Sequence, residues 1–189
     1  MPPRCSSLLV AAAGLTAALA AGCGGDDSPP PPPPPGPNGS VEIGTGALDG
    51  AAGFVAFSSG NDITLAPGSQ GGFHVFVNLR LDAEAAAAVG EIPLVARVAR
   101  RVSDGVLVSR TLQRRVRLVE REGVFETEAS LPLFLCPTPI GVAVGDRPIE
   151  LTVEVSDADE TNTYEATIRF TPRCPADDTA TFCANICFG

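Results

Sequence analysis

The sequence has few aromatic residues and only one kind of basic residue. It contains no tryptophan and a single tyrosine, Tyr164, and all 13 of its basic residues are arginines. Sugar-binding faces and interaction hot spots depend on flat amphipathic aromatic side chains, so this composition argues against both. The formal net charge of −9 over 189 residues argues against binding to nucleic acid.

The N-terminal segment has the anatomy of a signal peptide. Arg4 precedes an apolar run over residues 8–21, which ends in small residues directly before Cys23. The run is too short, and too rich in alanine and glycine, for a transmembrane helix. The segment Ala20-Ala21-Gly22-Cys23 resembles the cleavage box of bacterial lipoproteins, although Leu19 lies one residue before the usual leucine position.

This resemblance implies that Cys23 becomes the acylated N-terminus and that the protein is anchored in the cell envelope. Several acyl chains hold a protein durably, because each buried methylene contributes about 0.8 kcal/mol. Gly24 and Gly25 follow the cysteine in place of an aspartate, which in Gram-negative sorting implies the outer membrane. The alternative is ordinary cleavage after an Ala-x-Ala-like site, which would make the chain a secreted protein.

Composition divides the rest of the chain into a tether and one domain. The unbroken proline run over residues 29–35 favours polyproline II, a semi-rigid spacer of about 3.1 Å per residue. We therefore expect a signal peptide over residues 1–22 and a lipid-anchored, proline-rich linker over 23–40. A β-sandwich domain over 41–173 and a cysteine-containing tail over 174–189, packed on the domain, complete the expected order.

The cysteines indicate an exported protein. Once Cys5 and Cys23 are set aside, the remaining set is even in number, and an even set in an exported chain suggests two disulfides: Cys136, Cys174, Cys183 and Cys187. We prefer the arrangement in which Cys183 and Cys187 each reach elsewhere, one to Cys136 and one to Cys174. A zinc site of four cysteines is the alternative, but the chain has no CxxC knuckle.

From Val41 onward apolar residues recur with period two, which is typical of antiparallel strands with one buried face. The pattern predicts strands at 41–44, 53–57, 63–65 and 73–81, and a last hairpin over 149–156 and 164–170. Odd positions of 73–81 should face the core. We predict an all-β fold, an immunoglobulin-like antiparallel β-sandwich, with a jelly roll or small barrel as alternatives.

Connections between strands carry their own signals. Asp82 can cap and Gly90 can end a short helix, read as a crossover between two sheets, and residues 139–147 read as a second crossover. A two-residue turn at Glu122-Gly123 places position 117 opposite 128, with Val116, Leu118, Thr127 and Ala129 inside. A three-residue loop at 103–105 with left-handed Gly105 pairs Ala96 with Leu112 and Val102 with Val106 as the apolar face.

His74 is the only histidine in the sequence. It follows Gly68-Ser69-Gln70-Gly71-Gly72-Phe73, which lacks both a Gly-x-Ser-x-Gly elbow and a phosphate-loop ending. The Gln-Gly-Gly-Phe-His segment is similar to one in uncharacterised exported bacterial lipoproteins, and this similarity implies no activity. We expect a solvent-facing or hydrogen-bonded histidine, with an envelope hydrolase as the alternative.

Acidic and basic groups each offer a binding hypothesis. Asp157 and Asp159, with Glu160, form a loop that could hold Ca²⁺ in a calcium-responsive adhesion module, although we expect a solvated turn. Arginines concentrate in the middle hairpins: Arg97, Arg100, Arg101, Arg110, Arg114, Arg115, Arg117 and Arg121. They either protect strand edges and pair with Glu120, Glu126 and Glu128, or form a basic strip for an anionic partner.

The residues together predict a non-catalytic binding or structural domain anchored at the envelope, with no cofactor and no metal. Candidate binding residues are His74, Arg114, Arg115 and Arg117. The expected partners are the membrane, through the lipid, and an anionic envelope component or protein. Arg100, Arg110 and Arg114 fall on the predicted buried face of the hairpin, which the pattern leaves unexplained.

Overall fold

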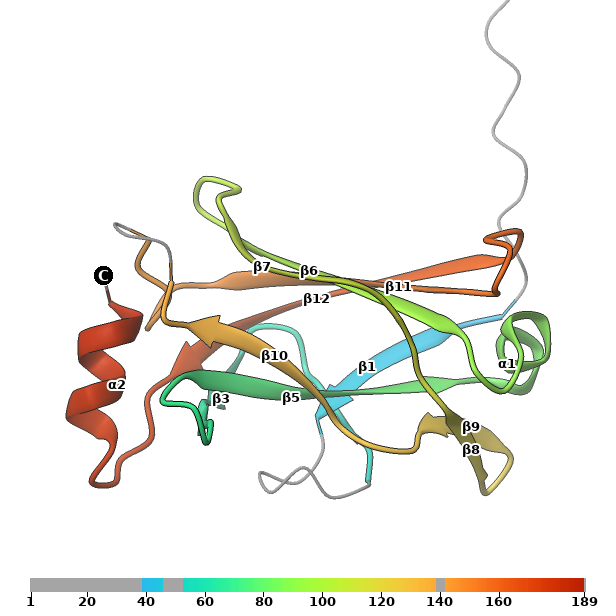
Figure 1. Ribbon diagram of the computed structural model, residues 1–189, viewed down its shortest axis with the longest axis horizontal. Helices are drawn as coiled ribbons and strands as arrows, with labels where there is room; N and C mark the ends of the chain where they lie inside the picture. The colour runs from blue at the N-terminus through green and yellow to red at the C-terminus, as the bar shows by residue number, and fades with distance from the viewer. Residues whose placement is uncertain (1–38, 46–52, 139–141, 189) are drawn as a thin grey trace, which may run out of the picture. The chain divides into compact units, whose positions relative to one another are not determined.

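Two β-sheets pack face to face as a sandwich, with a short helix at each end (Figure 1). The computed structural model describes residues 39–45, 53–138 and 142–188, which belong to a compact unit spanning Pro35–Gly189. The expected signal peptide, Cys23 and the proline run lie outside the described residues. The immunoglobulin-like β-sandwich predicted from the sequence is confirmed. None of the described helices is long and apolar enough to span a membrane.

The first sheet, called sheet I, is built around one long strand, β5 (Phe73–Leu81). Along the sheet the order is β2-β1-β5-β9-β8, and β4 and β10 also pair with β5. The flanking strands are β1 (Val41–Thr45), β2 (Val55–Ala56), β4 (Ala66–Pro67), β8 (Leu118–Arg121), β9 (Val124–Thr127) and β10 (Leu131–Cys136).

The second sheet, sheet II, has the order β3-β12-β11-β6-β7. Its strands are β3 (Asn61–Thr64), β6 (Leu94–Arg101), β7 (Leu107–Arg115), β11 (Ile149–Ser156) and β12 (Thr163–Arg173). All pairs are antiparallel except β12 with β3, which is parallel. The strand predicted at 63–65 corresponds to β3, which starts two residues earlier. Its parallel pairing with β12 was not predicted from the local pattern.

The predicted alternation of β5 is confirmed on its inner face. Its odd-numbered side chains, from Phe73 to Leu81, are all at most 1% exposed. The other face is covered as well, since His74 is 6% and Asn78 is 1% exposed. Phe76 and Phe134 flank the His74 ring, and the Asn78 amide donates a hydrogen bond to the carbonyl of Gly53. The expectation of a solvent-facing His74 is thus wrong, because short segments on both sides of β5 shield it.

The two predicted crossovers connect the sheets. Helix α1 (Ala83–Val89) leads from β5 to β6, and the Asp82 carboxylate accepts a hydrogen bond of 2.8 Å from the backbone N–H of Ala85. Gly90 ends the helix with a φ of 81°, a conformation that glycine adopts without strain. Residues 142–147, the described part of the second predicted crossover, lead from β10 to β11 without helix or strand.

The predicted register of the β8–β9 hairpin is confirmed. Leu118 pairs with Thr127, and the turn residues Glu122 and Gly123 have φ values of 53° and 83°. The backbone N–H of Glu128 donates to the carbonyl of Arg117 at 2.9 Å, as the register requires. Ala129, predicted to lie inside, is exposed instead, because pairing of the hairpin stops at Thr127. The β11–β12 hairpin also forms as predicted, with Ile149 opposite Phe170.

The predicted buried face of the β6–β7 hairpin is wrong. Residues 97–99 pair with 109–111 in the predicted register, but Leu112 is 73% exposed, whereas Val95, Arg97 and Ala99 are at most 1% exposed. The cause is β11, whose inward residues Val155, Val153 and Leu151 lie opposite Val95, Arg97 and Ala99. Opposed residues share a face of a sheet, so these three must point inward.

The turn of this hairpin is also one residue longer than predicted. The backbone N–H of Arg101 bonds the carbonyl of Val106 at 2.9 Å, which leaves a four-residue loop over 102–105. Gly105 is left-handed, with a φ of 69°, as predicted. A register shift between Ala99 and Arg100 accommodates the extra residue. The inverted face explains two of the arginines that the sequence left unexplained, because Arg100 and Arg110 lie on the outward face and are exposed. Arg114 lies opposite the inward Val95 after a second register shift, and it is exposed at the edge strand β7.

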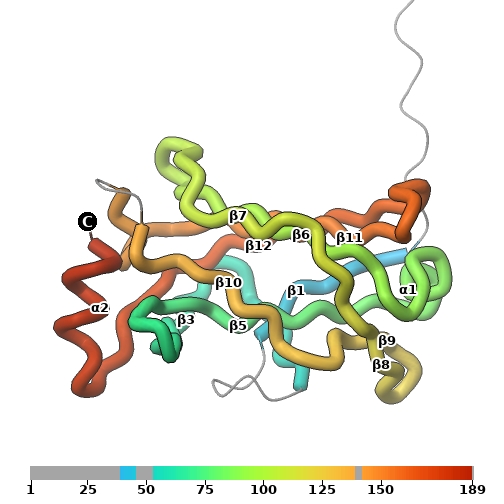
Figure 2. Tube along the Cα trace, in the orientation of Figure 1, coloured from blue at the N-terminus to red at the C-terminus, as the bar shows by residue number. Residues whose placement is uncertain are grey.

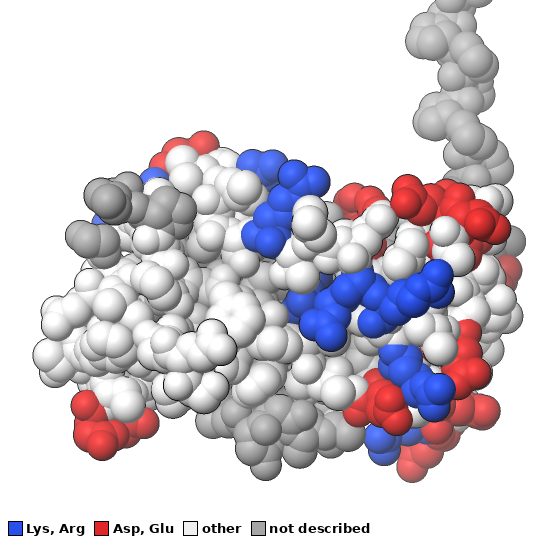
Figure 3. Space-filling model, in the orientation of Figure 1, with Lys and Arg blue, Asp and Glu red and all other residues white. Residues whose placement is uncertain are grey.

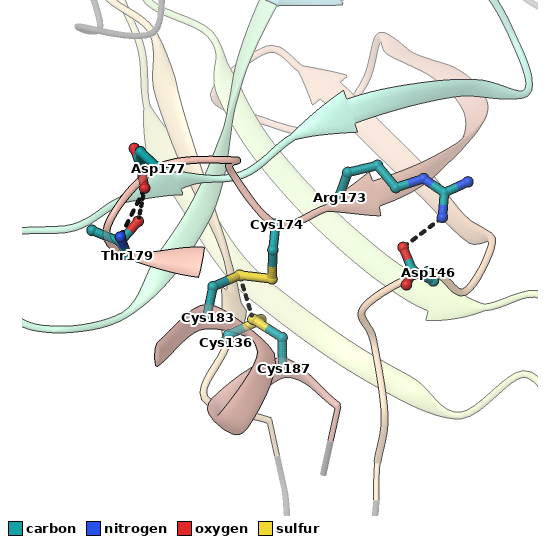
Figure 4. The surroundings of a disulfide bond; sticks show 8 residues. All are labelled: Cys136, Asp146, Arg173, Cys174, Asp177, Thr179, Cys183 and Cys187. Carbon is teal, nitrogen blue, oxygen red and sulfur yellow. Dashed lines mark hydrogen bonds and ion pairs between the residues drawn. A yellow bond between two sulfur atoms is a disulfide. The ribbon is translucent and has the colours of Figure 1, made fainter. Parts of the chain in front are cut away.

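Helix α2 (Ala180–Cys187) is joined to both sheets by disulfides (Figure 4). Cys187 bonds Cys136, the last residue of β10 in sheet I, and Cys183 bonds Cys174, which follows β12 in sheet II. This is the preferred pairing predicted from the sequence. Figure 2 shows the chain passing from β12 into α2 at the end of the sandwich opposite α1. A disulfide typically contributes about 2–4 kcal/mol to stability, so the two disulfides stabilise this end of the sandwich.

Candidate functional site

Arginines gather where the open edge of β7 faces β10. Figure 3 shows basic side chains over β6, β7 and the β8–β9 hairpin, while the end that carries α2 has few charged groups. The sequence explains the uncharged end, because residues 63–79, 129–145 and 179–189 contain no Asp, Glu, Lys or Arg. The molecule therefore separates its charges along its length, and the arginines form its basic region.

Arg97 is the most unusual of these arginines, because it is 1% exposed in the core between the two sheets. One guanidinium nitrogen, Nη1, donates a hydrogen bond of 3.1 Å to the carbonyl oxygen of Pro132 in β10. Its Nε has no hydrogen-bond partner, and no carboxylate of the described residues pairs with it. Burial, aided by the like charge of Arg114, lowers the pKa of Arg97 to about 10.

The surface arginines divide into paired and unpaired groups. Arg101 contacts Asp104 at 2.5 Å, Arg121 contacts Glu126 at 3.6 Å, and Arg117 contacts Glu91 at 3.8 Å. Among the predicted acidic partners, Glu126 alone forms ion pairs within the described residues, and Arg117 bonds Glu91 in place of Glu128. In the described part of the chain the following have no acidic partner: Arg100, Arg110, Arg114 and Arg115.

These unpaired charges favour the basic-strip interpretation over edge protection. A protein of net charge −9 has enough carboxylates to neutralise these four arginines, so their lack of an acidic partner leaves them available to an anionic partner. We define the arginine strip as Arg97, Arg114, Arg115 and Arg117, of which Arg117 is paired with Glu91 and the other three have no acidic partner among the described residues. Three of these residues, Arg114, Arg115 and Arg117, were predicted from the sequence as candidate binding residues. The burial of Arg97 was not predicted, because it follows from the pairing of Arg97 with the inward-facing Val153.

His74 lies beside a hollow of about 250 Å³ on the outer face of sheet I. Its ring meets Phe76 edge-on, with the centroids 4.5 Å apart, and Phe134 at 5.4 Å. The Nδ1 atom is buried without a hydrogen-bond partner, and a Cβ added to Gly68 would lie 3.4 Å from it. The turn at Gly68 thus closes over Nδ1, and burial lowers the pKa of His74, so the imidazole is neutral near pH 7.

The surroundings of His74 do not assemble a catalytic triad from the described residues. Ser69 lines the same hollow, but the buried Nδ1 of the imidazole has no hydrogen-bond partner, and no carboxylate of the described residues lines the hollow. A triad needs both contacts to activate the hydroxyl and to orient the imidazole. The geometry therefore gives no support to the hydrolase alternative.

The acidic loop between β11 and β12 uses its first carboxylate to close the turn. Asp157 accepts hydrogen bonds from the backbone N–H groups of Thr161 at 2.8 Å and Asn162 at 3.2 Å, and from the Asn162 amide at 2.8 Å. No three acidic side chains of the described residues come close enough together to share an ion. Asp157 and Asp159 thus form a solvated turn, and the geometry gives no support to a calcium site.

The cysteine sulfurs form the one cluster of potential metal ligands in the described residues. The Sγ atoms of Cys174, Cys183 and Cys187 lie within 4.8 Å of one another (Figure 4). All three are bonded in disulfides, and a metal binds cysteine as the thiolate. The cluster is therefore structural in this state.

Comparisons with known proteins add little to this geometry. No protein-family model matches the chain, and no curated protein matches it. Among solved structures, the chain is similar to the CooA pilin subunit from enterotoxigenic Escherichia coli. The match has 11% identity and a TM-score of 0.37, and it covers 72% of this chain and 99% of that chain. Because a TM-score below 0.5 does not establish a shared fold, we take the function from the geometry of this chain.

The buried charge of Arg97 predicts a stabilising substitution. Methionine fills a similar volume without a charge to desolvate, so Arg97→Met should raise the free energy of unfolding at pH 7 by roughly 1–3 kcal/mol. Urea denaturation measures the change. The exposed Arg110→Met is the matched control and should change stability by less than about 0.5 kcal/mol. A loss of stability in Arg97→Met would show that the guanidinium is satisfied in the fold.

The neutral imidazole of His74 predicts an acid-sensitive stability. The unfolded imidazole takes up a proton near pH 6.5, and the folded imidazole does so only at lower pH. Because the unfolded state binds more protons in this interval, the free energy of unfolding should fall as the pH drops from about 6.5 to 5.5.

His74→Leu should remove most of this slope, since carboxylates titrate mainly below about pH 5. Denaturant titrations of both proteins at several pH values measure it. The imidazole protons of the single histidine give its pKa directly by NMR. A pKa at or above 6.5, or equal slopes in the two proteins, would contradict the prediction.

Proposed function

We propose that the chain is a non-catalytic binding or structural protein, held at the cell envelope by a lipid on Cys23. The resemblance of residues 20–23 to a lipoprotein cleavage box supports the anchor, and residues 24–40 supply the spacer. The outer membrane is the proposed location, on the basis of the glycines after Cys23. The disulfides of the domain support an oxidising compartment, where such bonds persist.

The arginine strip carries the binding part of the proposal. Arg114 and Arg115 expose positive charge without an acidic partner among the described residues, and the buried charge of Arg97 lies near enough to Arg114 for the two to repel each other. Guanidinium groups bind phosphate and carboxylate oxygens in a bidentate way, which suits an anionic partner. The proposed partner is an anionic envelope component, such as a phosphorylated glycolipid, or an acidic protein.

The anchor is tested by removing its acceptor. Cys23→Ser should abolish labelling by radioactive palmitate and shift the protein from the membrane fraction to the soluble fraction. Cys5→Ser, which lies within the proposed signal peptide, is the matched control and should leave both unchanged. Retention of the Cys23→Ser protein in membranes, or an intact mass without acyl chains in the wild type, would refute the anchor.

The strip is tested with vesicles that carry a phosphorylated glycolipid and with neutral phosphatidylcholine vesicles. Wild type should bind the former, and the double variant Arg114→Glu/Arg115→Glu should bind at least about tenfold more weakly, because two charges are reversed. Arg147→Glu/Arg169→Glu changes the net charge equally at other sites and should bind like wild type. If both double variants bind the vesicles equally weakly, net charge alone explains the loss of binding, and a specific role for the strip is contradicted.

A further inference from the structure

The outer face of sheet II divides its charges between two halves. On the β6–β7 half, Arg110 points away from the core beside the apolar Ala96, Val98 and Leu112. On the β11–β12 half lie Glu154 and Glu165, with Glu160 from the adjoining loop. All these side chains line a shallow hollow of about 660 Å³. The face is thus positive along one side and negative along the other, with an apolar strip on the positive half.

Three charges on this face, those of Arg110, Glu154 and Glu165, have no ion-pair partner in the described part of the chain. Glu154 lies directly opposite Glu165 in the β11–β12 register, an arrangement that like charges make unfavourable. The next two rows are satisfied, since Thr152 and Thr167 share a hydrogen bond of 3.1 Å and Arg169 contacts Glu150 at 2.8 Å. No ion pair of the described residues includes Arg110, Glu154 or Glu165.

An exposed apolar side chain accompanies these charges. Leu112 is 73% exposed, the largest exposure among the large apolar side chains in the described residues. It lies in β7, and Arg110 is its neighbour on the same face two residues away. An apolar side chain beside unpaired charges is the composition of a protein–protein interface, where a polar rim surrounds an apolar centre.

We propose that this face binds the same face of a second copy of the chain. A twofold axis parallel to the strands, midway between β6 and β11, places β7 of each copy over β12 of the other. Each Arg110 then lies over the Thr152–Thr167 row of the opposite copy, one row from the Glu154–Glu165 pair, and its long side chain reaches Glu165 across that step. Leu112 enters the hollow. Both halves of the complementary surface are present in one chain, which is the requirement for an isologous dimer. The inference does not depend on the lipid anchor or on an anionic partner.

The test uses complementary charge reversal in the full chain carrying Cys23→Ser, so that acyl chains do not drive association. Sedimentation equilibrium measures the dissociation constant. Arg110→Glu alone, and Glu154→Arg/Glu165→Arg alone, should each raise it by roughly tenfold or more, because twofold symmetry repeats every lost pair. An equimolar mixture of the two variants restores opposite charges across both halves and should associate as tightly as wild type, within about threefold.

Arg147→Glu is the control, because it changes net charge on an exposed arginine outside this face, and it should leave the dissociation constant unchanged. Leu112→Asp provides a second break that does not alter the paired charges, and thermal unfolding verifies that each variant is folded. A wild type that stays monomeric at about 1 mM, dimers that survive both charge reversals, or a mixture that does not recover would each overturn the proposal. Ionic strength is no substitute for the swap, because salt also screens the repulsion between two chains of net charge −9.

Discussion

The apolar contact between the inner faces of the two sheets determines the rest of the structure. The inward rows of β5 and β11 are at most 1% exposed, and each such Val, Leu, Ile or Phe contributes roughly 1.5–3 kcal/mol on burial. Because β11 is fixed by this core, it also fixes which face of β6 is buried. Arg97 lies in that row, so the core that stabilises the domain also draws one guanidinium inward, at a cost of a few kcal/mol.

Local signals in the sequence predicted the elements whose cause is local. The alternation in residues 73–81, the cap at Asp82 and the turn at Glu122-Gly123 each depend on a few adjacent residues, and the structure contains all three. The face of β6 was mispredicted because both of its faces carry apolar residues and arginines. Only the pairing with β11, about 55 positions later, decides between them.

The sequence predicted which arginines make up the candidate site, but it did not predict how they are arranged or paired. The sequence shows that arginines concentrate over residues 97–121, but their ion pairs depend on which acidic residues the fold brings near. Glu91 reaches Arg117 from the segment before β6, and Glu126 serves both Arg80 and Arg121. The burial of His74 likewise depends on Phe134, which is 60 residues distant in the chain. Such contacts arise from tertiary packing, which no local pattern records.

The two disulfides that hold α2 also limit how far the domain can be stretched. Cys136 and Cys187 are 51 positions apart, and the second disulfide lies inside the loop that they close. At about 3.5 Å per residue, the crosslink withholds roughly 180 Å of contour length from any extension. A pull that enters through β1 can therefore lengthen the chain only as far as β10. Under force, the oxidised domain would therefore extend much less than the reduced domain, in which the crosslinked segment is also free to unfold and extend.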